Sequence, residues 1–122
     1  MRIYIAAPLS APTFEKMEMN ADTAIEAGIL LMLAGHTPFI PHLMLYVDKY
    51  YHDCEMDRAD VLGVLDYEDY MKYDLAWLRM CDAILWLSSS PGADRELMIA
   101  QKIGLKVFKS VTEVLKHDTA NM

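Results

Sequence analysis

Short apolar runs alternate along the chain with longer stretches in which apolar residues recur at helical spacing. Four runs are typical of short buried strands and cover residues 2–7, 36–41, 83–87 and 106–109. Helices are predicted at 15–34, 66–80, 91–103 and from Thr112 on, and the tail from Asp118 shows no periodicity. Because strands alternate with helices, the pattern predicts an α/β fold with a mostly parallel sheet and right-handed crossovers.

This order of elements indicates a doubly wound, flavodoxin- or Rossmann-like domain with four to five strands and helices on both faces. In such folds ligands bind where the carboxyl ends of the strands meet helix N-termini. The strand at 83–87 ends in a run of Ser88, Ser89, Ser90, Pro91 and Gly92, which opens the next helix. Glu96 lies one turn into that helix. Its carboxylate either points into the crevice or, with Asp94, only complements the helix dipole.

Three further residues are predicted near the same edge. Tyr4 lies inside the first strand, so its phenol either packs in the core or reaches the crevice. His42 directly follows the second strand and is either a hydrogen-bonded structural residue or a catalyst. Asp74 is an acid among the apolar positions of its helix, so it needs a partner or access to a cavity. Asp74 is therefore a functional candidate.

Residues 44–65 mix aromatic, acidic and apolar side chains without a clear period. We expect a loop or a short helix over the crevice. Its tyrosines, Tyr46, Tyr50 and Tyr51, would either stack on a planar ligand or pack against a neighbouring subunit. Four nearby side chains match no standard metal-ligand spacing, and no metal is predicted for them: His52, Asp53, Cys54 and Asp57.

Length and composition narrow the function classes. The 122 residues predict one domain, 1–122, and 54% apolar with 24% charged residues is ordinary for a globular protein. The net charge of −7 with 11 Lys and Arg disfavours a nucleic-acid polymer or an anionic membrane as partner. No signal peptide or membrane span is predicted. Cys54 and Cys81 are isolated thiols, which fits a cytoplasmic location.

Three sequence stretches together carry a family resemblance: IYIAAP near the start, GHTPFIPHL in the middle, and DLAWLRMCDAILWLSSSPGADRELMIAQKIGLKVF from Asp74 to Phe108. They resemble the nucleoside 2-deoxyribosyltransferase family, which includes the 2'-deoxynucleoside 5'-monophosphate N-hydrolases. The resemblance covers most of the chain apart from 44–65 and the tail. It implies cleavage of the N-glycosidic bond of a (deoxy)nucleoside or its 5'-monophosphate, by hydrolysis or base transfer, without a cofactor.

The resemblance also implies a role for each matched residue. Glu96 matches the glutamate that attacks the anomeric carbon of the sugar, and Tyr4 matches the tyrosine that positions it. Asp74 matches the aspartate beside the sugar and base, where a proton must reach the departing base. His42 matches a histidine of the hydrolases. Ser90 matches their phosphate-contacting serine, where the nucleoside transferases have an aspartate.

The chain departs from the family pattern after the first strand, where Ala7, Pro8 and Leu9 replace a glycine-rich loop. A phosphate would then depend on hydroxyl groups and on the N-terminus of the helix after Ser90. The residues that we expect to complete the substrate site are Ser10, Ser88, Ser89 and Gly92.

A second departure lies beside Glu96, where Asp94 and Arg95 replace the small residues usual in the family. These side chains either reshape the pocket or stop catalysis, so a non-catalytic nucleotide-binding module on the same fold is the alternative function. The family completes its site with residues from an adjoining subunit near the C-terminus, and Asn121 is the matching candidate. The resemblance thus implies a homodimer or a higher homo-oligomer.

Overall fold

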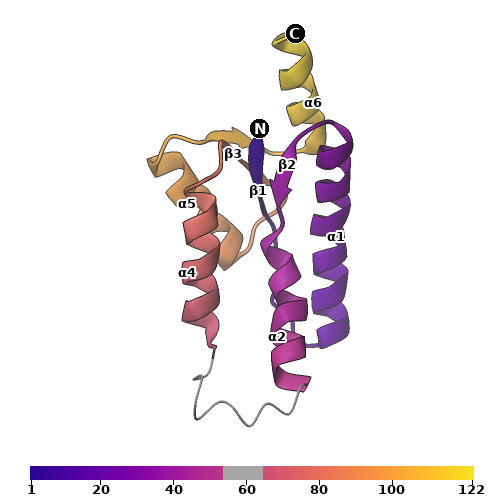
Figure 1. Ribbon diagram of the computed structural model, residues 1–122, viewed down its shortest axis with the longest axis vertical. Coiled ribbons are helices and arrows are strands. Elements are labelled where there is room, and N and C mark those ends of the chain that lie inside the picture. Colours follow the sequence, from indigo (N-terminus) through magenta and orange to yellow (C-terminus); the bar gives the residue numbers. More distant parts are fainter. Residues whose placement is uncertain (54–64) are drawn as a thin grey trace.

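The computed structural model describes residues 1–53 and 65–122 and shows a parallel sheet between two layers of helices (Figure 1). All three pairs of neighbouring strands are parallel, and the order is β2-β1-β3-β4. The strands are β1 (Arg2–Ala6), β2 (Thr37–Phe39), β3 (Ala83–Trp86) and β4 (Lys106–Phe108). The predicted doubly wound α/β fold is confirmed, with four strands in the described residues.

The helices agree with the predicted ones except for one short helix that was not predicted and for the end of the last helix. They are α1 (Phe14–Leu33), the short 3-10 helix η1 (Pro41–Leu43), α2 (Met44–Asp53), α4 (Tyr67–Leu78), α5 (Pro91–Lys102) and α6 (Val111–Ala120). The first ten residues of the segment 44–65 form α2, which confirms the short-helix alternative for these residues. The tail after Asp118 was predicted to be aperiodic, and this prediction is wrong, because α6 continues to Ala120. A hydrogen bond of 2.7 Å between His36 Nε2 and Asp118 Oδ2 holds its last turns.

Alternating side chains of β1 build the two halves of the core. Ile3 and Ile5 point to one face, where they pack with residues of α1 and α6 such as Leu31 and Val114. Tyr4 and Ala6 point to the other face, where α4 and α5 cover the sheet. The central strands are therefore apolar on both sides, as their sequences predict.

Side-chain caps fix where four helices begin. Each cap accepts a hydrogen bond from the backbone N–H three positions later, and the caps are Thr13, Asp66, Ser90 and Ser110. Thr13 and Ser90 start α1 and α5 close to the carboxyl ends of β1 and β3. The N-termini of these two helices therefore lie at the edge where the predicted site residues gather.

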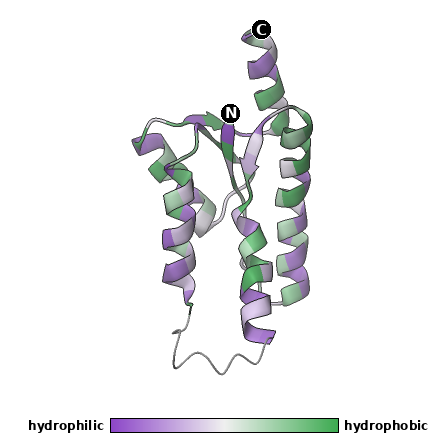
Figure 2. Cartoon of the chain, in the orientation of Figure 1, coloured by the Kyte–Doolittle hydropathy of each residue, from purple (hydrophilic) through white to green (hydrophobic). Residues whose placement is uncertain are grey.

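Hydrophobic and hydrophilic residues are interspersed along each helix (Figure 2). This pattern suits helices that cover a sheet with one side and meet solvent with the other. Among residues 1–53 and 65–122, none of the helices is long and apolar enough to cross a membrane.

Candidate active site

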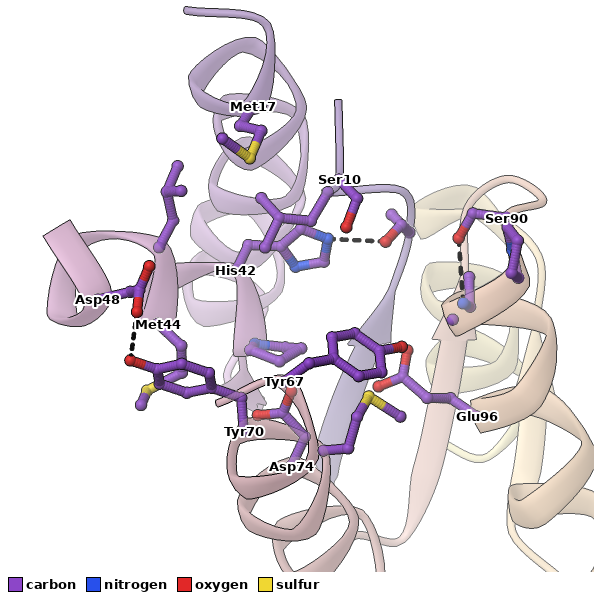
Figure 3. A pocket seen from close by; sticks show the side chains of 18 residues that line it. Ser10, Met17, His42, Met44, Asp48, Tyr67, Tyr70, Asp74, Ser90 and Glu96 are labelled. Atoms are coloured by element: carbon purple, nitrogen blue, oxygen red, sulfur yellow. Dashed lines mark hydrogen bonds between the residues drawn. The ribbon is translucent and has the colours of Figure 1, made fainter. Parts of the chain in front are cut away.

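A cavity of about 350 Å³ lies at the carboxyl edge of the sheet. Its walls come from the loop after β1, from η1 and α2, from α4, and from the start of α5 (Figure 3). Most of the predicted site residues line it, namely Ser10, His42, Asp74, Ser90, Gly92 and Glu96. The topology of the sheet thus brings together residues that lie far apart in the sequence.

Glu96 lies on the second turn of α5 and is only 7% exposed. The hydroxyl of Tyr4 donates a hydrogen bond to Glu96 Oε2. Tyr4 follows the first of its two alternatives: its ring packs in the core against Phe39, with ring centroids 5.5 Å apart, and Tyr4 does not itself line the cavity. Burial raises the pKa of Tyr4 well above its ordinary value, and the charges of Glu96 and Asp74 add to this. Tyr4 therefore stays protonated near neutral pH and donates its hydrogen bond to Glu96.

The carboxyl group of Glu96 has a pKa of about 7. Burial is the largest cause of the increase, and the negative charge of Asp74 raises the pKa further. The hydrogen bond from Tyr4 acts in the opposite direction, because it stabilises the ionised form. Near neutral pH, Glu96 therefore has access to both of its protonation states.

Asp74 projects from α4 into the same cavity, where burial raises its pKa to about 7. Its Oδ1 atom is buried and has no hydrogen-bond partner among the described residues. Two carboxyl groups with pKa values near 7 in one cavity share their protons at neutral pH. Such a perturbed pair is typical of sites that perform acid–base or nucleophilic chemistry.

His42 lies in η1, directly after β2, and is 3% exposed. Its Nε2 donates a hydrogen bond to the carbonyl of Ala7 at 2.9 Å, which ties η1 to the end of β1. Burial lowers the pKa of His42, so the ring is neutral and Nδ1 carries a lone pair. Nδ1 is buried and has no partner among the residues that the structure describes. His42 thus has a structural bond and also a spare acceptor at the cavity wall.

The serine run after β3 divides into two parts. Ser90 and Gly92 line the cavity, and Ser90 Oγ accepts a hydrogen bond from the N–H of Ala93 at 3.1 Å as the cap of α5. Ser88 and Ser89 are exposed and do not line the cavity. The hydroxyl of Ser89 donates to Asp94 at 2.6 Å. Of the three serines, only Ser90 is in a position to contact a ligand in this cavity.

Asp94 and Arg95 are exposed and lie outside the cavity. Asp94 also accepts a hydrogen bond from the indole N–H of Trp86 at 3.0 Å, so it braces the corner between β3 and α5. The hydrogen bonds from Ser89 and Trp86 lower the pKa of Asp94. The two large residues beside Glu96 therefore leave the cavity open.

Asn121 follows α6, and its side-chain amide donates to the carbonyl of His117 at 2.7 Å. Figure 1 shows this end of the chain near the N-terminus and far from α2 and the start of α4. Asn121 therefore does not line the cavity of its own chain. Its role in the site of a second subunit stays a prediction.

The sequence did not identify several residues of the cavity wall. Asp48 of α2 lines the cavity, and Tyr70 of α4 donates a hydrogen bond to Asp48 Oδ1 at 2.6 Å. The spacing of Tyr67, Tyr70, Met71 and Asp74 does predict one helix face, and all four line the cavity. The tyrosines at positions 46, 50 and 51 were expected either to stack on a ligand or to pack against a neighbouring subunit, and they do not line the cavity. The ligand-facing tyrosines come from α4 instead of α2.

Metal binding was considered for four residues near the end of α2. His52 and Asp53 belong to α2, whereas Cys54 and Asp57 lie outside the described residues. Within 1–53 and 65–122, no three His, Cys, Asp or Glu side chains cluster as a metal site requires.

Fold and site together define a doubly wound α/β protein with a pair of acids in a cavity at the carboxyl edge of its sheet. The chain belongs to the family described as "Domain of unknown function (DUF4406)", whose model matches residues 1–109. The matched region includes every element from β1 to β4. A comparison with curated proteins finds no match.

One similar solved structure is a 2-deoxyribosyltransferase from the psychrotolerant bacterium Bacillus psychrosaccharolyticus, a biocatalyst for the synthesis of antiviral and antitumoral nucleosides. The two chains superpose with a TM-score of 0.57 and are 19% identical. The match covers 88% of this chain and 69% of the other. At this identity the comparison shows a shared fold.

Proposed function

We propose that the protein cleaves the N-glycosidic bond of a (deoxy)nucleoside or its 5'-monophosphate, with Glu96 as the nucleophile. The observation that carries the proposal is the buried Glu96 carboxyl, which accepts a hydrogen bond from Tyr4 and shares its cavity with Asp74. The family resemblance supports these roles. The fold shared with a 2-deoxyribosyltransferase supports the same class of reaction.

In the first step, the ionised Glu96 attacks the anomeric carbon of the sugar. Tyr4 holds Oε2, so Oε1 is the oxygen that forms the new bond. As this bond forms, the C–N bond breaks and its electron pair moves to the base. The protonated Asp74 delivers a proton to the departing base. The products of this step are the free base and a glycosyl ester on Glu96.

The second step releases the sugar and regenerates the acid pair. Asp74, now ionised, takes a proton from a water molecule or from a second base, and the activated group attacks the anomeric carbon. The ester bond to Glu96 then breaks. Water gives hydrolysis, and a second base gives exchange. We expect hydrolysis to be the main reaction. A second free base competes with water and directs the reaction toward base exchange.

The choice between nucleoside and monophosphate depends on the cavity wall. Ser10, Ser90 and the N-terminus of α5 are suited to contact a phosphate. In contrast, Asp48 and Glu96 also line the cavity, and their carboxylates repel an anion. Although Ser90 matches the phosphate-contacting serine of the hydrolases, we expect the uncharged nucleoside to be the better substrate because of this repulsion.

A non-catalytic nucleotide-binding module was the alternative because Asp94 and Arg95 replace small residues beside Glu96. Both side chains are exposed and lie outside the cavity. They therefore give no reason to expect a disabled site. An assay of turnover and of ligand binding distinguishes the enzyme from a non-catalytic binding module.

The test is a chromatographic assay of the purified protein with ribo- and deoxyribonucleosides and their 5'-monophosphates, with and without a second free base. We expect release or exchange of the base, abolished in Glu96→Ala and retained in Asp94→Ala, which removes an exposed acid from the same helix. If no base is released from any compound while a nucleotide raises the Tm, the protein is a binding module instead.

The resemblance also supports a homo-oligomer in which Asn121 of one subunit reaches the site of another. We expect sedimentation to give at least a dimer and Asn121→Ala to lower kcat/KM. A monomer with full activity would exclude this arrangement. The cytoplasmic location stays a prediction from the sequence.

A further inference from the structure

Asp48 and Tyr70 form a hydrogen-bonded pair in the cavity wall that the proposed reaction does not use. The Tyr70 hydroxyl donates to Asp48 Oδ1 at 2.6 Å, and this bond joins α2 to α4. His52 Nε2 lies 3.3 Å from the same oxygen. Among the described residues, both neighbours of Asp48 approach Oδ1, so Oδ2 is left to accept a hydrogen bond from a ligand.

The position of this pair relative to Asp74 indicates which part of a substrate it meets. Tyr70 precedes Asp74 by four residues on α4, so it lies about 6 Å along the same helix face. Figure 3 shows Asp48 and Tyr70 on the side of the cavity away from Ser90 and Glu96. A base that receives its proton from Asp74 lies against α4, and it extends toward Asp48 because α5 closes the other side.

The walls of the cavity suit a flat ring. Met44, Leu45 and Met71 line the cavity, and so does Tyr67, whose ring Figure 3 shows on the side toward Glu96. Thioether and aromatic side chains pack well against planar heterocycles. Asp48 is the polar group at the end of the cavity away from Glu96 (Figure 3). The edge of the bound base would lie beside it.

We propose that Asp48, positioned by Tyr70, selects nucleobases that carry an exocyclic amino group. This inference rests on the proposed function, because Asp74 sets the direction of the base. An amino group donates a hydrogen bond to the Asp48 carboxylate. An oxo group in the same place cannot do so, because the oxo oxygen and the carboxylate oxygen are both acceptors. Cytosine is therefore preferred over uracil, and adenine over hypoxanthine.

The experiment compares kcat/KM within two matched pairs, 2'-deoxycytidine against 2'-deoxyuridine and 2'-deoxyadenosine against 2'-deoxyinosine. We expect the amino member to be favoured by about tenfold or more, since a site built for a hydrogen bond rejects the analogue that lacks it. Asp48→Asn should bring the ratio close to one, because its amide also donates to an oxo group. Tyr70→Phe should reduce the ratio to a smaller extent.

The control is Asp53→Asn, which makes the same change on α2 at an exposed residue paired with Lys49. This variant should keep the wild-type ratio. General damage to the fold lowers the activity on both members of a pair and leaves the ratio unchanged. The ratio therefore separates recognition of the base by Asp48 and Tyr70 from a purely structural role.

Failure of this inference differs from failure of the proposed function. Equal turnover of both members of each pair by the wild type would overturn the role of Asp48 and leave Glu96 as nucleophile. If no nucleoside is turned over, calorimetric titration with the same four compounds replaces the rate. A binding preference for the amino members that Asp48→Asn removes would still support the inference, and equal or absent binding would refute it.

Discussion

Tyr4 and Glu96 are 92 positions apart in the sequence, and the hydroxyl of the first donates a hydrogen bond to the carboxyl of the second. Tyr4 is fully buried in β1, which pairs with a strand on each side, so the bond is anchored in the centre of the sheet. Because burial keeps Tyr4 protonated, it holds one oxygen of Glu96 at every physiological pH. The core of the fold thereby orients the carboxyl group that faces the cavity.

Tyr4→Phe tests this bond while keeping the ring that packs against Phe39. Without the donor, the pKa of Glu96 rises above 7, because the hydrogen bond from Tyr4 lowers it. We expect the acid limb of the kcat/KM profile to move to higher pH. We also expect a loss of about 10- to 100-fold at pH 7, the usual value of a hydrogen bond to a charged group. An unchanged pH profile would show that Tyr4 has only a packing role.

Glu96→Gln should stabilise the protein at alkaline pH while it abolishes turnover. The pKa of Glu96 is raised from 4.5 to about 7, so the folded state holds its proton more tightly than the unfolded state. Above pH 7 the buried charge therefore costs on the order of 2–3 kcal/mol, and below the unfolded pKa it costs nothing. Urea unfolding should show Glu96→Gln to be more stable at pH 8, with no advantage near pH 4.

Asp94→Asn is the matched control, because its stability at pH 8 should change in the direction opposite to that of Glu96→Gln. The pKa of Asp94 is lowered by its hydrogen bonds to Ser89 and Trp86, so its ionised form stabilises the fold. This contribution is present at pH 8 and is lost as the pH falls through the folded pKa. Asp94→Asn should therefore be less stable than the wild type at pH 8. If both variants changed stability in the same direction at pH 8, the burial argument for Glu96 would fail.

Asp74→Asn should remove the basic limb of the pH profile. The productive form of the pair has Glu96 ionised and Asp74 protonated, and both pKa values are about 7. The wild type should therefore give a bell-shaped kcat/KM profile centred near neutrality. The variant should lose about 100-fold or more with natural bases. It should retain kcat/KM on a deoxyriboside with a nitrophenolate leaving group, because departure of that group needs no proton, whereas kcat should still fall because Asp74 is also the base of the second step. Equal losses on both substrates would argue against proton delivery by Asp74.

The fold was predictable because its signals are local. The strand at 83–87 is apolar throughout, and Ser90 followed by Pro91 predicts where α5 begins, as the structure confirms. The end of α6 was not predictable from the local pattern. Its last turns are held by the contact between Asp118 and His36, two residues that meet only after the sheet has formed.

The sequence predicted those site residues whose place follows from the topology of the sheet. His42, Asp74 and Glu96 follow from the rule that parallel strands gather their carboxyl ends at one edge. The geometry of the corner after β3 decides which serine faces the cavity, and the sequence SSS does not encode that choice. Asp48 was missed because α2 buries only one of its ten residues, Leu45, so few apolar positions mark which of its faces turns inward.

Gly28 lies where α1 meets the segment that leads into the site, and Gly28→Ala should destabilise the protein. A Cβ at this position would collide with Ile40 Cδ1, lie 3.0 Å from Ile40 Cγ1 and meet Ile5 Cδ1 at 3.5 Å. Alanine normally stabilises a helix relative to glycine, by about 1 kcal/mol. Overpacking of a core costs about 1–3 kcal/mol, so we expect a net loss of stability in urea unfolding.

The double variant Gly28→Ala/Ile40→Val identifies the cause. Valine lacks the Cδ1 atom of Ile40 that a Cβ at position 28 would meet first, so the second change should recover the loss. Gly92→Ala is the control, because its added Cβ would meet no atom within 4 Å and its helix should gain from alanine. Because Ile40 is followed directly by η1, the single variant should also lower turnover through a displaced His42. Wild-type stability in Gly28→Ala would mean that Ile40 moves aside without cost, and the close packing of α1 on this segment would then have no energetic role.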